Sequence, residues 1–500
     1  MTSAPLVVTG EQRRALATLC AGNRSVMGVV QQVAVRQRTS LEWHARSLES
    51  ASAGRSQLPY FSPVLPLCVA RAQGGRIACV DGHDYVDVHM GYTAGILGHN
   101  PPQVVAGVAA ALGSTPGAGY FVPAQVELAE LVQQLVPGAE RAAFLHAGAD
   151  AVLAAVRLCR ARTRRSVIAK FEGCYHGWHE PGLVNTAPTW AGRMAQGPLH
   201  AIAPELATAG MNRLHGDEFL ILPYGDPLAL QLIRDHAHEL AGVLLDPVPR
   251  FMMNDLDGAA QFARQVRAVT QELEVPLIAD EVVTGFRLAP GGIAQAFGVE
   301  ADLHCFGKIT GGLGLPISLV AGRAELMTQA STAGLLDDYV SSRVWISTTT
   351  AGNALSVTAA LHQLRAIQAG GETLFCAIDA HHQRIRAAVN AVATDLGLPV
   401  TVDGHPRLYS MLSVNVDPPD PTGLSAADAA NPARAYFRRF TLGNVRAARL
   451  LTLYLRLQGV YAEGLPTVDL SAAHSTADTD QIIHGLRESL TSMQAHGAFA

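Results

Sequence analysis

The stretch that decides the fold is RAAFLHAGADAVLAAVRLCRAR, residues 141–162, in which an apolar run passes through a glycine directly into a helical pattern. Residues 141–148 are short and apolar, which is typical of a buried strand, and residues 149–162 repeat apolar side chains at helical spacing. A strand that turns into a helix is the building unit of sheets covered by helices. The stretch therefore predicts an α/β fold.

Further apolar runs of the same kind follow along the chain, at residues 166–173, 218–226, 241–248, 275–282 and 317–323. Helical patterns lie between several of these runs, for example at 259–274. The alternation predicts a mostly parallel central sheet with helices on both faces. Ligands bind such sheets at the carboxyl ends of the strands, so functional side chains are expected just past each run.

The pattern changes on either side of this core. Residues 76–90 indicate a hairpin that turns at Asp81-Gly82, and long helical stretches after about residue 355 precede a strand-like LYSMLSVNV at 408–416. We therefore expect a large domain at 95–365 and a smaller α/β domain at 366–500. Residues 1–94 are expected to form an N-terminal extension and a segment that joins the small domain.

Composition excludes several classes of function. The 500 residues are 49% hydrophobic and only 16% charged, with a formal net charge of -5, so neither nucleic acid nor an anionic membrane is an expected partner. Neither a signal peptide nor an apolar run of about 18 residues is evident. We expect a cytoplasmic protein. The seven cysteines are scattered and form no C-x-x-C pair, so neither disulfides nor a metal site is predicted.

Lysine is nearly absent from the chain, and its two occurrences stand out. Only Lys170 and Lys308 are lysines, and all other basic side chains apart from histidine are arginine. An arginine supplies positive charge but no nucleophilic amine. Because Lys308 is one of only two lysines and lies between Gly307 and a run of glycines in FGKITGGLGLP, we predict that its amine is reactive. Lys170 lies inside the apolar run 166–173 and is predicted to be structural.

Three kinds of functional group follow predicted strands along the chain. The turn at Gly148 presents backbone N–H groups at a helix N-terminus, which favours a phosphate. Asp280 ends an apolar run and can hold a proton on a ring nitrogen, while the amine of Lys308 can condense with an aldehyde. A phosphate, a protonated pyridine and an aldehyde together describe pyridoxal 5'-phosphate (PLP).

The sequence resembles a known family through specific motifs. DGHDYVDVHMGYTAGILGHNPPQVV, KFEGCYHGWHE, IADEVVTGFR, FGKITGGLGLP and TTTAGNALSVTAAL match class III (subgroup II) aminotransferases in order and spacing, from about Ser62 to the C-terminus. The pattern is most similar to the branch of the glutamate-1-semialdehyde aminomutases. The resemblance implies PLP fold type I: a large domain with a mostly parallel central sheet, and a smaller domain from the N-terminal segment and C-terminal third.

The resemblance also implies roles for individual residues. Lys308 would be the Schiff-base lysine and proton shuttle, and Asp280 would pair with the pyridine nitrogen of PLP. The other cofactor-binding residues that it implies are Val282 and Tyr175 on the two ring faces, Gly148 and Ala149 at the phosphate, His176, Asp246, and Thr349, which would reach the phosphate of a neighbouring subunit. The last role implies a homodimer with shared active sites.

Departures from the family pattern bear on the substrate. The family's S-G-T-E phosphate loop reads AGAD at 147–150, and Leu65 stands where the aminomutases have an arginine that grips the substrate carboxylate. Phe251 replaces an asparagine, and Pro466 replaces a glutamate near the site entrance. The candidate substrate-binding residues are Arg407, Tyr92, His89 and Phe251. Apolar packing explains His89 and Tyr92 as well, and Arg407 can instead cover a surface strand.

These departures favour an aminotransferase over an aminomutase. We expect an enzyme that moves an amino group from an amino-acid donor to a ketone or aldehyde acceptor, both small molecules, in a specialised biosynthetic pathway. A PLP-dependent aminomutase, racemase or decarboxylase on the same scaffold is the alternative. A descendant that has lost the cofactor and serves as a binding protein is a third reading.

Overall fold

The computed structural model describes residues 10–51, 65–186, 208–212, 218–330, 343–414 and 445–499. The chain divides into two compact units. The first comprises Met1–Pro101, Thr373–Pro418 and Leu442–Ala500, and the second comprises Pro102–Glu372 and Pro419–Thr441. These units are defined by internal contacts. The domain boundaries expected from the sequence, at residues 94/95 and 365/366, stay a prediction.

The second unit is built around a seven-stranded sheet in the described part of the chain, with the order β4-β10-β9-β8-β7-β5-β6. Its strands are β4 (Arg141–Leu145), β5 (Val167–Phe171), β6 (Phe219–Leu222), β7 (Leu240–Leu245), β8 (Leu277–Asp280), β9 (Leu303–Phe306) and β10 (Ser318–Gly322). Strands β5 to β9 pair in parallel, whereas β10 runs antiparallel to both β4 and β9. The predicted mostly parallel sheet is confirmed.

One strand of this sheet was not predicted. Strand β9 has four residues, and His304 and Cys305 occupy its middle, so it lacks the apolar run that marks its neighbours. All four residues are nevertheless buried, because the strand lies between β8 and β10 in the interior of the sheet. Position in the sheet outweighs side-chain polarity here.

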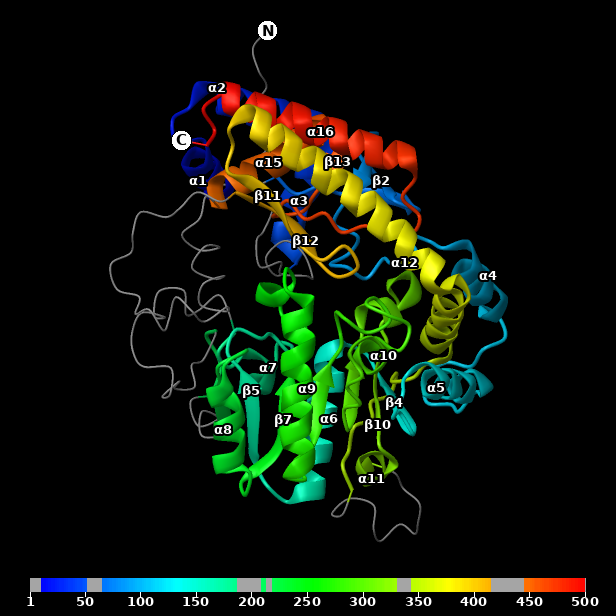
Figure 1. The fold of residues 1–500 in the computed structure, drawn as a ribbon. Helices are drawn as coiled ribbons and strands as arrows, with labels where there is room; N and C mark the ends of the chain where they lie inside the picture. Colours follow the sequence, from blue (N-terminus) through cyan, green and yellow to red (C-terminus); the bar gives the residue numbers. More distant parts are fainter. Residues whose placement is uncertain are drawn as a thin grey trace. The chain divides into compact units, whose positions relative to one another are not determined.

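Helices cover both faces of the sheet, as the alternating pattern predicts. Helix α6 (Gly148–Thr163) packs with Ile168 of β5 in one apolar cluster, while Phe262 of α9 (Leu256–Glu272) lies 5.5 Å from Phe171, between ring centroids. Ile168 and Phe171 are three residues apart on one strand and therefore point to opposite faces. Figure 1 shows α9 in front of β7 and α6 behind the sheet.

The remaining helices of this unit are short, apart from one. They are α4 (Pro102–Ala111), α5 (Pro123–Leu135), α7 (Glu180–Leu183), α8 (Pro227–His236), α10 (Gly292–Phe297) and α11 (Ala324–Met327), with the 3-10 turns η4 (Arg250–Met252), η5 (Lys308–Thr310), η6 (Gly312–Gly314) and η7 (Thr328–Ala330). Helix α12 (Ala354–Leu396) kinks at Gly371, whose φ is 49°, and the division between the two units falls within it. Glycine adopts such a positive φ without a Cβ clash.

The first unit carries a four-stranded sheet in the order β1-β2-β3-β13. Its strands are β1 (Val69–Gln73), β2 (Arg76–Cys79), β3 (Asp84–Asp87) and β13 (Val460–Tyr461), and β11 (Val400–Gly404) pairs separately with β12 (Ser410–Val414). Strands β2 and β3 form the predicted hairpin, and Gly82 in its turn has a φ of 82°. The helices are α1 (Gly10–Cys20), α2 (Arg24–Arg36), α3 (Arg38–Ser50), α15 (Val445–Leu457) and α16 (Thr476–Ala495). None of the helices in the described residues is long and apolar enough to cross a membrane.

Candidate active site

The candidate site lies at one edge of the seven-stranded sheet. Strands β4, β5, β7, β8 and β9 all run in the same direction, because β10 alone is reversed between β4 and β9. Their carboxyl ends therefore meet at one edge. The chain leaves that edge toward Gly148, Glu172, Asp246, Glu281 and Gly307, so the segments that carry the predicted cofactor residues of this unit are brought together.

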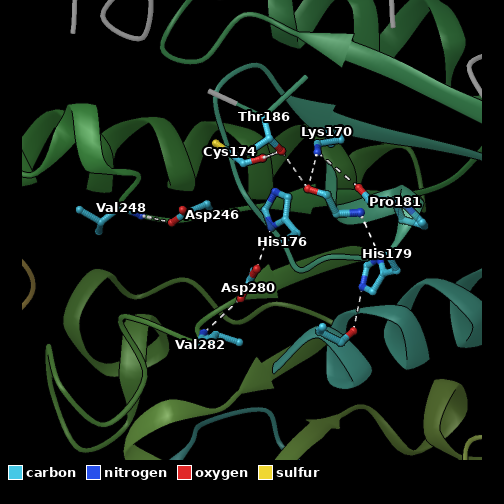
Figure 2. Close-up of polar contacts among 12 residues, drawn as sticks. Lys170, Cys174, His176, His179, Pro181, Thr186, Asp246, Val248, Asp280 and Val282 are labelled. Carbon is cyan, nitrogen blue, oxygen red and sulfur yellow. Dashed lines mark hydrogen bonds and ion pairs between the residues drawn. The ribbon is translucent and has the colours of Figure 1, made fainter. Parts of the chain in front are cut away.

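Two adjacent carboxyl groups at the end of β8 have opposite surroundings. Asp280 faces the sheet edge, where its Oδ2 lies 2.7 Å from Nδ1 of His176 and its Oδ1 accepts from the backbone N–H of Val282 at 3.1 Å (Figure 2). Glu281 points the other way, and its carboxylate contacts His304 Nδ1 and the backbone N–H of Ile293, each at 2.7 Å. Successive side chains of a strand alternate in direction, so Glu281 anchors the strand end that presents Asp280.

The ring of His176, in its neutral form, holds Asp280 through a hydrogen bond. Burial lowers the pKa of His176, although the hydrogen bond and charge of Asp280 act in the opposite direction. A neutral imidazole beside a carboxylate donates its Nδ1 proton to Oδ2. Within the described residues, the buried Nε2 of His176 has no hydrogen-bond partner. His176 therefore acts on Asp280 as a neutral hydrogen-bond donor.

Lys308 begins the turn η5 directly after β9. Its φ of 45° lies in the left-handed region, which costs a residue with a Cβ free energy, and its side chain is half-buried. Gly307 before it is extended, and Thr310 closes the turn by donating from its backbone N–H and hydroxyl to the Gly307 carbonyl at 3.0 and 3.1 Å. Such strained residues are concentrated at functional sites, where the surrounding structure holds them.

Two glycines bring the Lys308 turn against the start of α6. A Cβ on Gly148 would lie 2.6 Å from a methyl carbon of Val282, and a Cβ on Gly307 would lie 3.3 Å from the Cα of Gly148. Side chains at either position would push the three segments apart. The glycines thus allow the lysine turn, the Asp280 strand end and the predicted phosphate loop to touch.

The first turn of α6 is shaped to receive an anion. Asp150 accepts from the backbone N–H of Ala147 at 3.0 Å and so fixes the chain entry into the helix. The first backbone N–H groups of a helix, here those of Gly148 and Ala149, have no acceptor within it and lie at the positive end of its dipole. A phosphate would find donors there without the hydroxyl side chains of the family's usual loop.

The segment between β5 and α7 carries Tyr175 and His176 to the same edge. The ring of Tyr175 is 53% exposed, which leaves a face that a planar ligand can cover. His179 of this segment is a residue that the sequence reasoning missed. Its Nε2 lies 2.8 Å from the Ala149 carbonyl, and its Nδ1 accepts from the Gly182 N–H at 3.0 Å. The signal available was its place in GWHE, just before a helix.

Asp246, at the end of β7, is a second carboxyl group at this edge. Its Oδ1 accepts from the Val248 N–H at 3.1 Å, and burial together with the charge of Asp280 raises its pKa to about 8. Phe251 lies in η4, where its ring packs against Tyr224 at 5.4 Å between centroids. Tyr224 also contacts Phe171, so Phe251 borders the aromatic core on this side of the sheet.

Thr349 is exposed on a segment that is tied to the end of β4. Its neighbours Thr350 and Thr348 contact the two ring nitrogens of His146, at 2.6 and 3.3 Å. The threonine segment is therefore fixed beside the loop that leads into α6. The His146 contact could not be predicted from sequence, because the two segments lie about 200 positions apart in the chain.

Other predicted residues belong to the first unit. His89 and Tyr92 pack edge to face with ring centroids 4.2 Å apart, and Arg407 forms an ion pair with Asp379 at 2.7 Å. Leu65 is fully buried in this unit. The Ser62-Pro63-Val64 segment lies outside the described residues. The substrate roles of His89, Tyr92, Arg407 and Phe251 stay predictions.

The residues at the sheet edge fit PLP. An amine on strained backbone, a buried carboxylate held by a neutral imidazole and a glycine-lined helix start correspond to the aldehyde, the pyridine nitrogen and the phosphate of that cofactor. Any Cβ at Gly148 or Gly307 would crowd the space at which these three groups meet. The fold and the site together define an enzyme of PLP fold type I.

The sequence pattern of the family described as Aminotransferase class-III matches residues 60–418, and the chain belongs to this family. It is 34% identical over 419 residues to a glutamate-1-semialdehyde 2,1-aminomutase from Deinococcus radiodurans, covering 82% of this chain and 86% of the relative. It is also similar to an omega-transaminase from Sphaerobacter thermophilus, with 25% identity, a TM-score of 0.77 and coverage of 91% and 98% of the two chains. A transaminase with PLP bound has a TM-score of 0.75 and 25% identity, over 92% of this chain and 99% of the other. The cofactor of the chain is PLP.

The comparisons correct the predicted reaction. The expectation of an aminotransferase with separate donor and acceptor is wrong, because relatives at 30–35% identity are named glutamate-1-semialdehyde 2,1-aminomutases. The error arose from giving three positions, Leu65, Phe251 and Pro466, more weight than the similarity of the whole chain. Pro466 is a buried residue whose carbonyl accepts from the backbone N–H of Leu412 at 2.9 Å. Packing therefore also constrains which residue can stand at this position.

Proposed function

We propose that this chain is a PLP-dependent aminomutase that moves the amino group of glutamate-1-semialdehyde from carbon 2 to carbon 1. The observation that carries the proposal is the 34% identity over 82% of the chain to an enzyme with that name. The reaction is an isomerisation, so substrate and product have the same atoms and no second carbonyl compound is consumed. The bound cofactor supplies the aldehyde that takes up the amino group and the ring that withdraws electrons from the bond being broken.

Lys308 is the residue to which we assign proton transfer. An isomerisation between adjacent carbons requires a proton to be removed at one carbon and delivered at the next, and a single amine can do both. Its place on a turn between Gly307 and Thr310, after the last residue of β9, puts the side chain at the sheet edge. The same amine is proposed to form the covalent link with the cofactor aldehyde.

Asp280 is assigned to the ring nitrogen of the cofactor. The neutral ring of His176, whose Nδ1 lies 2.7 Å from Oδ2 of Asp280, holds this side chain in place. A full carboxylate charge beside a pyridine nitrogen stabilises the protonated ring. Gly148 and Ala149 are assigned to the phosphate, and Val282 and Tyr175 to the ring faces.

A homodimer with shared sites is part of the proposal. In the second unit, Tyr120 and Phe121 are 65% and 81% exposed, and Trp345 is 56% exposed on the segment that leads to Thr349. Large exposed aromatic side chains support a subunit contact. We expect light scattering to give about twice 52.8 kDa in solution. A monomer of unchanged activity would exclude a role for Thr349 across subunits.

The decisive experiment supplies glutamate-1-semialdehyde as the sole substrate. Purified enzyme loaded with PLP is expected to convert it to 5-amino-4-oxopentanoate, followed by chromatography, with no release of a keto acid. The control is the Lys308→Ala variant, for which no product is expected. Product formation that depends on an added amino-acid donor, with keto acid released in equal amount, would overturn the proposal.

Mixed subunits test whether Thr349 acts across the dimer. Lys308→Ala and Thr349→Ala chains are unfolded and refolded together, or coexpressed with different tags. If Thr349 serves the partner's site, the mixed dimer contains one fully native site, and activity exceeds that of Thr349→Ala alone. If Thr349 serves its own chain's site, no native site forms and mixing adds nothing.

A further inference from the structure

The second lysine of the chain is built into a clamp of backbone carbonyls. Lys170 on β5 is fully buried, and its Nζ donates to the carbonyls of Pro181, Gly182 and Val184 at 3.3, 3.3 and 2.6 Å. Figure 2 shows the amine beside Pro181. These three carbonyls belong to the segment Glu172–Thr186, which leaves β5 and returns past α7. The side chain thus ties the far end of that segment to the strand from which it starts.

The number of acceptors matches a charged amine. An ammonium group has three N–H donors and a neutral amine has two, so three carbonyls are fully served only by the charged form. None of the ion pairs among the described residues involves Lys170. Burial lowers the pKa of Lys170 to about 7, while the nearby Cys174 and Asp280 oppose that change. The three carbonyl oxygens are the hydrogen-bond acceptors that lie around this amine.

Gly182 connects this clamp to the carboxylate at the site. Its carbonyl accepts from Lys170 Nζ, from the backbone N–H of His176 at 3.2 Å and from Thr186 Oγ1 at 3.0 Å. A Cβ at this position would lie 2.4 Å from the Gly177 carbonyl, so the segment closes tightly on itself there. His176, held through its main chain at Gly182, directs its ring to Asp280.

A second branch leads from the same glycine to the start of α6. The Gly182 N–H donates to Nδ1 of His179, which leaves Nε2 as the protonated nitrogen that donates to the Ala149 carbonyl at 2.8 Å. Burial lowers the pKa of His179, which favours this neutral form. A Cβ on Gly177 would lie 2.6 Å from that of Ala149, so the two segments are in close contact.

We propose that Lys170 is a positioning residue: through Gly182 it fixes the Glu172–Thr186 segment, and that segment sets both the His176–Asp280 pair and the Ala149 end of the phosphate cradle. The inference rests on PLP as the cofactor and is independent of the reaction proposed above. Its ammonium also lies near the His176 ring and disfavours a second proton there.

The test compares Lys170→Met with Ile168→Val. Methionine keeps the length and apolar stem of lysine but has no donor and no charge, whereas Ile168, fully buried on the same face of β5, has no polar role. In Lys170→Met we expect amide exchange of residues 173–184 to rise about tenfold or more, since local opening no longer breaks the clamp. We also expect cofactor bound by the apoenzyme about tenfold more weakly. Ile168→Val is expected to lower the melting temperature and leave both quantities unchanged.

A spectroscopic measurement separates positioning from packing. The pH at which the visible band of bound PLP titrates should differ from that of the native enzyme in Lys170→Met. It should be unchanged in Ile168→Val, because only the first variant changes the charge near Asp280. If Lys170→Met alters only the melting temperature, Lys170 is a packing residue and the proposal is overturned.

Wild-type enzyme provides the test if Lys170→Met does not fold. Enzyme labelled with ¹³C at lysine Cε gives two side-chain signals, because the chain has two lysines. One signal is expected to respond to added PLP, and the other to titrate near neutral pH, together with opening of residues 173–184. The other groups near the Lys170 amine are Cys174, His176, His179 and Asp280, and only Lys170 contributes a Cε signal. A second signal that titrates like free lysine would contradict the clamp.

Discussion

The two lysines of the chain lie at the ends of β5 and β9, in opposite surroundings. Lys170, inside β5, is fully buried, and its amine is surrounded by three carbonyl acceptors. Lys308, just past β9, is half-buried on strained backbone between glycine-rich turns. An amine enclosed by carbonyls inside the sheet cannot be reached by a carbonyl compound, whereas an amine at the sheet edge can be. The position relative to the strand end therefore distinguishes the buried lysine from the one to which we assign reactivity.

The largest effect is expected from removing the amine at the end of β9. Lys308→Ala and Lys308→Arg should both lose on the order of 10⁴-fold or more of the turnover, because neither side chain can form the covalent link. Borohydride reduction followed by peptide mass analysis should place the cofactor on Lys308 in the native chain. Cofactor mass on the peptide containing Lys170, or turnover retained in the arginine variant, would reverse the assignment of the two lysines.

The next effect concerns the two acids at the end of β8. Asp280→Asn retains an oxygen for the Val282 N–H but loses the charge, and we expect turnover to fall by about 10²–10³-fold. Glu281→Gln is the matched control, since its carboxylate faces His304 and Ile293 instead. It should lower the melting temperature and leave turnover within a few-fold. Equal losses of turnover in both variants would mean that Asp280 acts only through packing.

A smaller effect is expected in the pH dependence of stability in the apoenzyme. The pKa of Asp246 is raised in the folded protein to about 8 from 3.8. The unfolded chain therefore loses this proton at lower pH than the folded chain, and folding stability should fall as pH rises from about 4 to 8. Asp246→Asn should flatten this dependence, as measured by denaturant unfolding at pH 4 and at pH 8. Parallel stability curves for the two proteins would contradict the raised pKa.

The smallest effect is expected at His179, at the junction of the two cofactor loops. His179→Ala removes the contact with Ala149 and the cap on Gly182, and we expect cofactor affinity to weaken about three- to tenfold. Titration of apoenzyme with PLP gives this value. Glutamine can reproduce one of the two contacts, so His179→Gln should fall between alanine and native. An affinity unchanged in His179→Ala would show that the Ala149 loop is held by other contacts.

Much of the fold could be predicted because it depends on local pattern. The strand at 141–145, the glycine at 148 and the helix after it are contiguous, and their apolar spacing identifies them. The hairpin at 76–90 likewise depends on a short turn with its own glycine. Strand β9 escaped prediction because its burial is imposed by neighbours from elsewhere in the chain and not by its own side chains.

The site was predictable where chemistry sits at a strand end, and not where contacts are long-range. Asp280 ends an apolar run, so sheet topology alone brings it to this edge. Lys308 could be singled out by the rarity of lysine and its glycine-rich surroundings, although the strand before it was not predicted. The contact between His179 and Ala149 joins residues 30 positions apart, and the one between Glu281 and His304 joins residues 23 apart. The local sequence around each residue does not indicate which residue it contacts. The reaction was mispredicted because single substitutions do not reveal how the rest of a pocket compensates.

The rarity of lysine, with one of its two copies sealed inside the sheet, has a practical consequence for handling the protein. Most enzymes present many surface amines to acylating reagents, so that immobilisation on an activated support is random and mostly harmless. Here the two ε-amines are those of Lys170, which is buried, and Lys308, so a preparation stripped of cofactor would be coupled to the support through its terminal α-amine or through the side chain to which we assign the covalent link. Attachment through cysteine or an affinity tag avoids this inactivation.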